Sequence, residues 1–264
     1  MLIDTHCHLD FQQFDQDRRE VIARAAAAGV HAIIVPALDL ENARAVVALA
    51  EQHPRVFAAV GVHPNSSAEW DSTWIAQLRQ LAQHEKVVAI GEIGLDYYWD
   101  KSPPVVQKRA FKAQLELAAE LDLPVIIHNR DASEDVLELL GDATLTQRRE
   151  RPGVLHSFSA SREVAERAVE MGYYLGFTGP LTYKTADELR EVAAWVPSDR
   201  LLVETDAPYL TPAGSDGRRG GRNEPAFVRR VADRIAAIRG IRPNIVDAMT
   251  TENASCLFGR RILE

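Results

Sequence analysis

The chain has 264 residues, of which 46% are hydrophobic and 26% charged, the composition of a water-soluble globular protein with a sizeable core. Its 30 Lys and Arg against 38 Asp and Glu give a formal net charge of −8, which argues against a broad nonspecific nucleic-acid-binding surface. The two cysteines, Cys7 and Cys256, are too few and too far apart for a disulfide framework or a CxxC zinc motif, so any metal must be held by His and carboxylates. No apolar run long enough to span a membrane and no secretory leader are visible, so we expect a cytoplasmic protein that does not bind membranes.

Short runs rich in Val, Ile and Leu alternate along the chain with stretches that have apolar residues at helical spacing. The expected strands, in chain order, are residues 2–6, 31–35, 56–60, 87–91, 125–128, 153–156, 173–176 and 201–204. A representative helix is expected after Pro103 and Pro104, with one apolar face formed by Phe111, Leu115, Ala118 and Leu121. Strands that are apolar throughout indicate a parallel sheet covered on both faces.

Eight strand–helix units predict an α/β fold with one domain, residues 1–264, built as a single (β/α)₈ TIM-like barrel. In such barrels the active site lies at the C-terminal ends of the strands. A doubly wound open sheet is the alternative fold. Its dinucleotide-binding form is disfavoured, because no G-x-G-x-x-G motif follows the first strand.

Five of the eight histidines fall at or just beyond the ends of expected strands, where about one would fall by chance. The first strand ends in His6, Cys7 and His8, and its period-two spacing points both histidines to one face, where they can close on one cation, while Cys7 points to the other face. Two buried structural histidines are the alternative, but burying two imidazoles without partners is costly. The sequence therefore predicts a cation site at the barrel mouth.

Further candidate ligands end the fourth, fifth, sixth and eighth strands. Glu92 is suited to bridging two metals, although a salt-bridge carboxylate is the alternative, and His128 and His156 would complete a second site with it. Taken alone, each of these histidines has a weaker case, with a place in the core or behind a ligand as the alternative. Asp206 can hold a cation and accept the proton of an attacking water, while Glu204, on the same strand face, can orient a ligand histidine.

Three other features bear on substrate. His63 is interpreted as a neutral donor to a bound oxyanion, with an ordinary loop histidine as the alternative. The aromatic cluster at 97–99 can stack nucleobases or pack against the barrel rim. A basic cluster follows the last strand and is suited to phosphate contacts unless it is a merely solvated loop: Arg218, Arg219 and Arg222.

In its motifs and their order, the sequence resembles the TatD-type metal-dependent deoxyribonucleases of the amidohydrolase superfamily. The resemblance runs in order from the first strand to the last and is carried by segments 3–10, 61–64, 91–97, 156–159, 204–210 and 222–225. Departures from the usual family pattern are Ala160, Asn129 and segment 176–179, none of which is a candidate ligand. The His-x-His opening alone would indicate only the wider superfamily.

The resemblance implies a TIM-like barrel that holds up to two divalent cations and hydrolyses DNA phosphodiesters, often from the 3′ end of single strands. One cation would be held by His6, His8, Glu92 and Asp206, and the other by Glu92, His128 and His156. His63 and Arg130 would face the scissile phosphate, and Tyr98 and Arg222 are the further substrate contacts that we expect. The ligand types accept Mg²⁺, Mn²⁺ and Zn²⁺ alike.

We therefore expect a hydrolase in which divalent cations acidify a water, Asp206 accepts its proton, and Glu92 and His63 complete the catalytic set. The expected substrate is single-stranded DNA, cleaved as a 3′–5′ exonuclease. An amidohydrolase or esterase acting on another substrate, such as an aminoacyl-tRNA ester, is the alternative, since the same site can attack either electrophile. A barrel that binds metal without catalysis is a third interpretation, disfavoured because every expected ligand is present.

Overall fold

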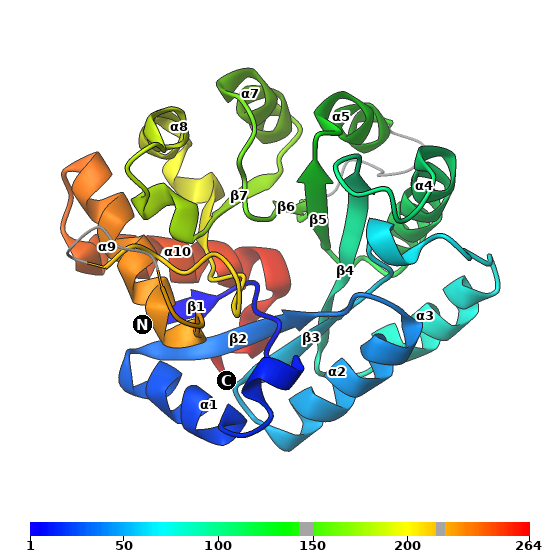
Figure 1. Ribbon diagram of the computed structural model, residues 1–264, viewed down its shortest axis with the longest axis horizontal. Coiled ribbons are helices and arrows are strands. Elements are labelled where there is room, and N and C mark those ends of the chain that lie inside the picture. The colour runs from blue at the N-terminus through cyan, green and yellow to red at the C-terminus, as the bar shows by residue number, and fades with distance from the viewer. Residues whose placement is uncertain (143–149, 215–219) are drawn as a thin grey trace.

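The fold is an eight-stranded parallel sheet whose strands pair in sequence order, as seen in a computed structural model that describes residues 1–142, 150–214 and 220–264 (Figure 1). The strands are β1 (Leu2–Asp4), β2 (Val30–Pro36), β3 (Val56–Val60), β4 (Val87–Asp96), β5 (Val125–Arg130), β6 (Gly153–Leu155), β7 (Tyr174–Phe177) and β8 (Leu201–Val203). Each lies within two residues of its predicted start. The largest difference is at β4, which continues to Asp96 because it pairs with β5 up to Arg130.

The ring is completed between its first and last strands by contacts beyond the regular ladder. The amide of Thr5 donates to the carbonyl of Val203 over 3.4 Å, and a parallel bridge joins Cys7 to Ala207. The predicted barrel is therefore confirmed as a nearly closed one, with β1 and β8 side by side.

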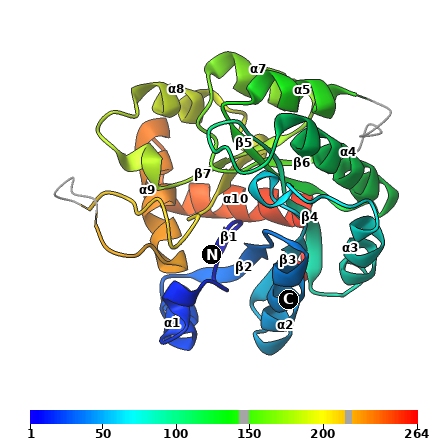
Figure 2. The same ribbon diagram turned by 45° about the vertical axis from the view of Figure 1, so that its right-hand side comes forward.

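Helices surround the ring and cover its outer face (Figures 1 and 2). The helices of the described residues are α1 (Arg18–Ala27), α2 (Leu40–Gln52), α3 (Trp74–Ala82), α4 (Pro104–Glu120), α5 (Ser133–Gly141), α7 (Arg162–Glu170), α8 (Asp187–Trp195) and α9 (Val228–Arg239), together with α10 (Pro243–Phe258), which lies across one end. Their ends follow local chemistry: Asp39 caps α2 by accepting the amide of Asn42, and Gly240 ends α9 in the left-handed conformation. The predicted α4 face is confirmed, since Phe111 and Leu115 are buried.

The barrel interior is a separate apolar cluster made of alternate strand residues, among them Ile3 and Leu202. Phe258 and its neighbours at the end of α10 belong to the same cluster, so this helix covers one end of the barrel. That end is the amino-terminal one, because His31 at the start of β2 hydrogen-bonds the carbonyl of Leu263 over 3.0 Å. The carboxyl ends of the strands form the opposite mouth. None of the helices in the described parts of the chain combines the length and apolar character that a membrane crossing needs.

Candidate metal centre

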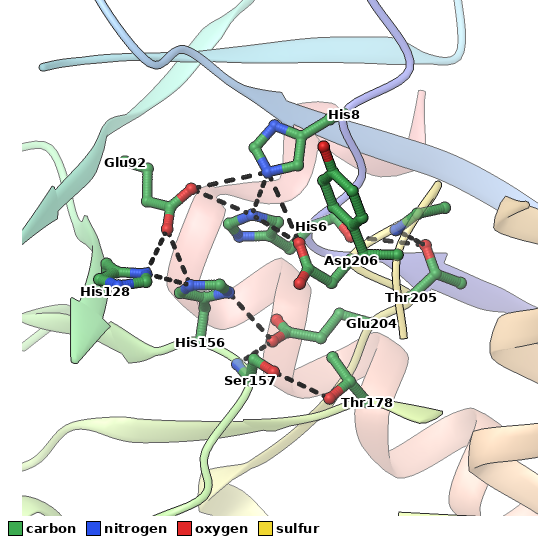
Figure 3. A network of polar contacts seen from close by, with 12 residues as sticks. His6, His8, Glu92, His128, His156, Ser157, Thr178, Glu204, Thr205 and Asp206 are labelled. Carbon is green, nitrogen blue, oxygen red and sulfur yellow. Dashed lines mark hydrogen bonds and ion pairs between the residues drawn. The ribbon is translucent and has the colours of Figure 1, made fainter. Parts of the chain in front are cut away.

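The six predicted metal ligands converge at the carboxyl-terminal mouth of the barrel (Figure 3). They come from five places in the ring: His6 and His8 after β1, Glu92 in β4, His128 in β5, His156 after β6 and Asp206 after β8. Gly94 permits one of these approaches, because a Cβ there would lie 2.0 Å from the carbonyl oxygen of His128 on the neighbouring strand. Local backbone strain accompanies the site, since Asp206 has a φ of 53° and Ser157, after His156, a φ of 44°.

One group of donor atoms surrounds the Oε2 side of Glu92. The Nε2 atoms of His6 and His8 lie 3.3 Å apart, and Oε2 of Glu92 lies 3.4 Å and 3.7 Å from them. Oδ1 of Asp206 lies 3.6 Å and 3.5 Å from the same two nitrogens. Ligands about 2.1 Å from a tetrahedral cation are about 3.4 Å from one another, so these side chains fit a divalent metal without large movement.

A second group lies on the Oε1 side of the same carboxylate. Oε1 of Glu92 is 2.9 Å from Nδ1 of His128 and 2.8 Å from Nε2 of His156, and the two nitrogens are 3.4 Å apart. Nε2 of His63 lies 3.5 Å from the same oxygen. Glu92 thus presents one oxygen to each group, which is the arrangement that a carboxylate bridging two cations requires.

The charge states of the two carboxylates and of His6 suit cation binding. Burial would raise the pKa of Glu92, but the surrounding His156, His63 and His6 hold it well below its usual value. Burial likewise opposes ionisation of Asp206, but His8 and His6 lower its pKa. Burial and the neighbouring His156 lower the pKa of His6 to about 4, so its imidazole is neutral and offers a lone pair. Anionic carboxylates beside a neutral imidazole form a donor set that Zn²⁺, Mn²⁺ and Mg²⁺ accept.

His63 has a defined tautomer. Its Nδ1 accepts the backbone N–H of Asn65 over 3.0 Å, so the ring proton must lie on Nε2, which faces Glu92. Burial lowers the pKa of His63, which keeps the ring neutral. The residue therefore presents an N–H donor at the edge of the cluster, as an oxyanion contact requires.

Asp96, at the end of β4, belongs to the site although it was absent from the predicted set. It is buried, and its Oδ2 lies 2.9 Å from Nε2 of His128, on the opposite side of the ring from Glu92. Burial would lower the pKa of His128, but the hydrogen bonds to Asp96 and Glu92 raise it to about 9. Period-two spacing, which places Glu92 and Asp96 on one strand face, is the sequence signal that could have found it.

Glu204 lies behind His156. Its Oε1 accepts the backbone N–H of Ser157 and lies 3.8 Å from Nδ1 of His156, and its Oε2 accepts the hydroxyl of Thr5 over 3.1 Å. Burial raises its pKa to about 7. Glu204 thus lies on the side of His156 away from Glu92, where a residue that orients the ring would lie.

The exposed aromatic side chains lie on the rim of the mouth. Tyr98 and Trp99 are about half exposed, and the guanidinium of Arg130 lies 3.8 Å above the Tyr98 ring. A second aromatic pair, not predicted, is formed by Phe11 and Tyr209, whose ring centroids are 6.1 Å apart, and Phe11 stacks on His8. The loops after β4 and β8 are four strands apart in an eight-stranded ring, so the two aromatic pairs flank the cluster from opposite sides.

The basic cluster is only partly described. Arg218 and Arg219 lie outside the described residues. Arg222 makes a two-pronged ion pair with Asp17 at 2.7 Å, and its guanidinium lies over the ring of Phe14. The structure therefore places Arg222 in a contact that ties the loop after β8 to the segment before α1, and its role toward substrate stays a prediction.

Known proteins resemble this chain along nearly its whole length. Residues 3–259 match the family model for TatD related DNase. The uncharacterized metal-dependent hydrolase YabD of Bacillus subtilis (strain 168) is 44% identical over 258 residues, covering 98% of this chain and 99% of the relative. The 3′-5′ ssDNA/RNA exonuclease TatD of Salmonella typhimurium is 40% identical over 260 residues, covering 97% and 98%. The crystal structure of YJJV, a TatD homolog from Escherichia coli K12, has a TM-score of 0.90 at 39% identity, with 97% of both chains covered.

These matches extend over the ring of strands and over every residue of the metal-ligand cluster. The resemblance drawn from the sequence motifs is thereby confirmed, as is the expected barrel. The chain belongs to the TatD-related DNase family of the amidohydrolase superfamily and is a metal-dependent hydrolase.

Proposed function

We propose that the protein is a 3′–5′ exonuclease on single-stranded DNA that works with two divalent cations, Mg²⁺, Mn²⁺ or Zn²⁺. The observation that carries the proposal is the position of Glu92, whose two carboxylate oxygens face two separate groups of nitrogen and oxygen donors. One group would consist of His6, His8 and Asp206, and the other of His128 and His156, with Glu92 common to both. Cations held there would acidify a water and offset phosphate charge.

The chain's own residues supply the remaining chemistry. Asp206 is ionised and lies beside the first group, so it is placed to accept a proton from water. The Nε2–H of His63 is placed to donate to a phosphoryl oxygen at the second group. Glu92 contributes by holding both groups at a fixed separation.

A nucleic-acid substrate is favoured by the rim. The protein carries a net charge of −8, so a polyanion must be attracted locally. Arg130 is exposed beside the mouth, and Tyr98 beneath it offers a face on which a base can stack, with Arg222 as a further candidate phosphate contact. Aromatic pairs on both sides of the cluster suit an extended single strand better than a small amide. Relatives about 40% identical are named as exonucleases of single-stranded DNA and RNA.

The test is cleavage of a single-stranded oligonucleotide with a fluorophore at its 5′ end, after chelation and reloading with each cation. The proposal predicts a ladder that shortens progressively from the 3′ end, and inhibition by phosphorothioate linkages at that end. Glu92→Gln protein prepared in parallel controls for a contaminating nuclease. Hydrolysis of aminoacyl-tRNA or of small amides, with the oligonucleotide left intact, would overturn the proposal and favour the esterase or amidohydrolase alternative.

A further inference from the structure

The carboxylate of Asp96 has four donors, two on each oxygen. Oδ1 accepts the backbone N–H groups of Tyr98 and Trp99, each over 3.0 Å. Oδ2 accepts the side-chain amide of Asn65 over 3.1 Å and lies 2.9 Å from Nε2 of His128. One oxygen therefore holds the loop after β4, and the other is directed at a ring in the cluster.

The contact at Oδ2 determines which nitrogen of His128 can bind a cation. Both ring nitrogens face a carboxylate oxygen at 2.9 Å, and a carboxylate can only accept, so without a cation each nitrogen would hold a proton. A cation bound beside Nδ1 would displace the proton there, and the one remaining N–H would lie on Nε2, where Asp96 accepts it. The lone pair then lies on Nδ1, which is 2.9 Å from Oε1 of Glu92 and 3.4 Å from Nε2 of His156. With the opposite tautomer, Nδ1 would point a proton at the same place.

We infer that Asp96 is a positioning residue that holds His128 as the Nε2–H tautomer, and that the cation on the Oε1 side of Glu92 depends on it. The inference rests on the proposed two-cation site. It assigns different roles to the two acidic residues of β4, because Glu92 contacts both donor groups whereas Asp96 contacts one member of one group, His128. The cation between His6 and His8 should therefore not depend on Asp96.

Asp96→Asn is the informative variant because the amide has one defined orientation. Its oxygen must take the Oδ1 position, since the backbone N–H groups of Tyr98 and Trp99 remain donors. Its NH₂ group then faces Nε2 of His128, which can pair with it only as an acceptor. The ring proton moves to Nδ1 and the lone pair leaves the cluster. Asn65 can turn its amide to adapt, because its own Oδ1 is buried without a hydrogen-bond partner among the described residues.

The experiment compares Zn²⁺-loaded wild type and Asp96→Asn by ¹⁵N NMR of histidine-labelled protein and by calorimetric titration of the metal. In wild type we expect a protonated Nε2 on His128 and two bound Zn²⁺. In the variant we expect a non-protonated Nε2 and a second Zn²⁺ that binds about 10–100-fold more weakly, as is usual when the partner of a ligand histidine is lost. The first Zn²⁺ should bind with unchanged affinity.

Asp135→Asn is the matched control, because Asp135 accepts the hydroxyl of neighbouring Tyr97 over 2.6 Å but belongs to neither donor group. It should bind two Zn²⁺ as wild type does. The inference is overturned if Asp96→Asn keeps both affinities and a protonated Nε2. A non-protonated Nε2 in Zn²⁺-loaded wild type also overturns it, and that measurement does not require the variant to fold. Wild type that binds one Zn²⁺ would instead contradict the two-cation proposal, and the protonation of Nε2 would still test the role of Asp96.

Discussion

Oε1 of Glu92 lies 2.8 Å from Nε2 of His156, although the two residues come from β4 and from the turn after β6. The other oxygen of the same carboxylate lies 3.4 Å from Nε2 of His6. Because Glu92 serves both donor groups and His6 serves one, Glu92→Ala should lose more activity than His6→Ala. We expect the loss in Glu92→Ala to exceed the roughly 10²–10³-fold effect typical of deleting one electrostatic contact.

The measurement is turnover of the 5′-labelled oligonucleotide with saturating Mg²⁺, Mn²⁺ and Zn²⁺ in turn, with bound metal counted for each variant. His6→Ala serves as the control for loss of a single ligand. Near-normal turnover of Glu92→Ala with all three metals would contradict a carboxylate shared by two cations.

Asp206→Asn should separate proton transfer from metal binding. Asn tolerates the left-handed backbone of this position, where φ is 53°, and its amide oxygen can still coordinate. An amide is a poor base, so kcat should fall about 10²–10⁴-fold while metal affinity falls much less. Single-turnover cleavage and metal titration on the same preparation provide the two values. Retention of most activity would mean that another group accepts the proton.

The barrel itself was predictable from sequence because its strands are short, continuous apolar runs that recur at regular intervals along the chain. The strand ends could be placed to within a few residues, and those ends carry the candidate ligands. The convergence of His6, His8 and Glu92 could therefore be predicted. The end of β4 was missed because its last residues, Leu95 and Asp96, remain in the sheet only through pairing with β5.

Partners brought together by tertiary structure could not be found in the same way. Asp96 resembles an ordinary loop carboxylate until the fold places His128 against it, 32 residues along the chain. The ion pair of Arg222 with Asp17, which joins positions 205 residues apart, was likewise not predicted. Period-two spacing places Asp96 on the strand face of Glu92, but its contact with His128 depends on the register in which β4 pairs with β5. The contact of Arg222 with Asp17 depends on how the loop after β8 lies against the segment before α1.

Gly176→Ala should disturb the support behind His156. A Cβ at this position would lie 2.5 Å from Oε2 of Glu204, closer than atoms can approach, so the carboxylate must move. Its hydrogen bonds from Ser157 and Thr5 would weaken, and overpacking of this kind costs about 1–3 kcal/mol. Gly141→Ala is the control, because among the described residues its Cβ would meet only Sδ of Met171, at 3.6 Å. Urea unfolding of both variants is the measurement, and equal stabilities would contradict the close contact.

Asp4 should make stability depend on pH. Burial raises its pKa to about 8 in the folded protein from 3.8 in the unfolded chain, even though Thr205 donates to it. Between these two pH values Asp4 holds a proton in the folded state and releases it in the unfolded state. The stabilising contribution of this proton is complete below about pH 4 and is lost as pH rises toward 8. Asn cannot titrate and mimics the protonated acid, so Asp4→Asn should not show this loss.

The check is urea unfolding of wild type and Asp4→Asn with a chelator present. The free energy of unfolding of wild type, relative to the variant, should fall by about 2–3 kcal/mol between about pH 5 and pH 7. Glu204, whose pKa is also raised, is present in both proteins, so it enters the difference only through its electrostatic interaction with Asp4. A difference that is constant over this range would mean that Asp4 is ionised when folded.

Arg130 and Tyr98 should contribute to strand binding in ways that salt can distinguish. Each phosphate contact on a single strand contributes about −0.7 to the slope of log affinity against log salt, so Arg130→Ala should flatten that slope by about this amount. Tyr98→Ala removes a stacking face worth about 1–3 kcal/mol and should lower affinity with little change of slope. Arg222→Ala should flatten the slope less than Arg130→Ala, because Arg222 is already paired with Asp17. Fluorescence anisotropy of a labelled oligonucleotide between about 50 and 200 mM salt, in an Asp206→Asn background that slows cleavage, gives all three slopes. If Arg222→Ala flattened the salt slope more than Arg130→Ala, the oligonucleotide would cross the mouth on the β8 side, beside Phe11 and Tyr209, and not over the loop that follows β4.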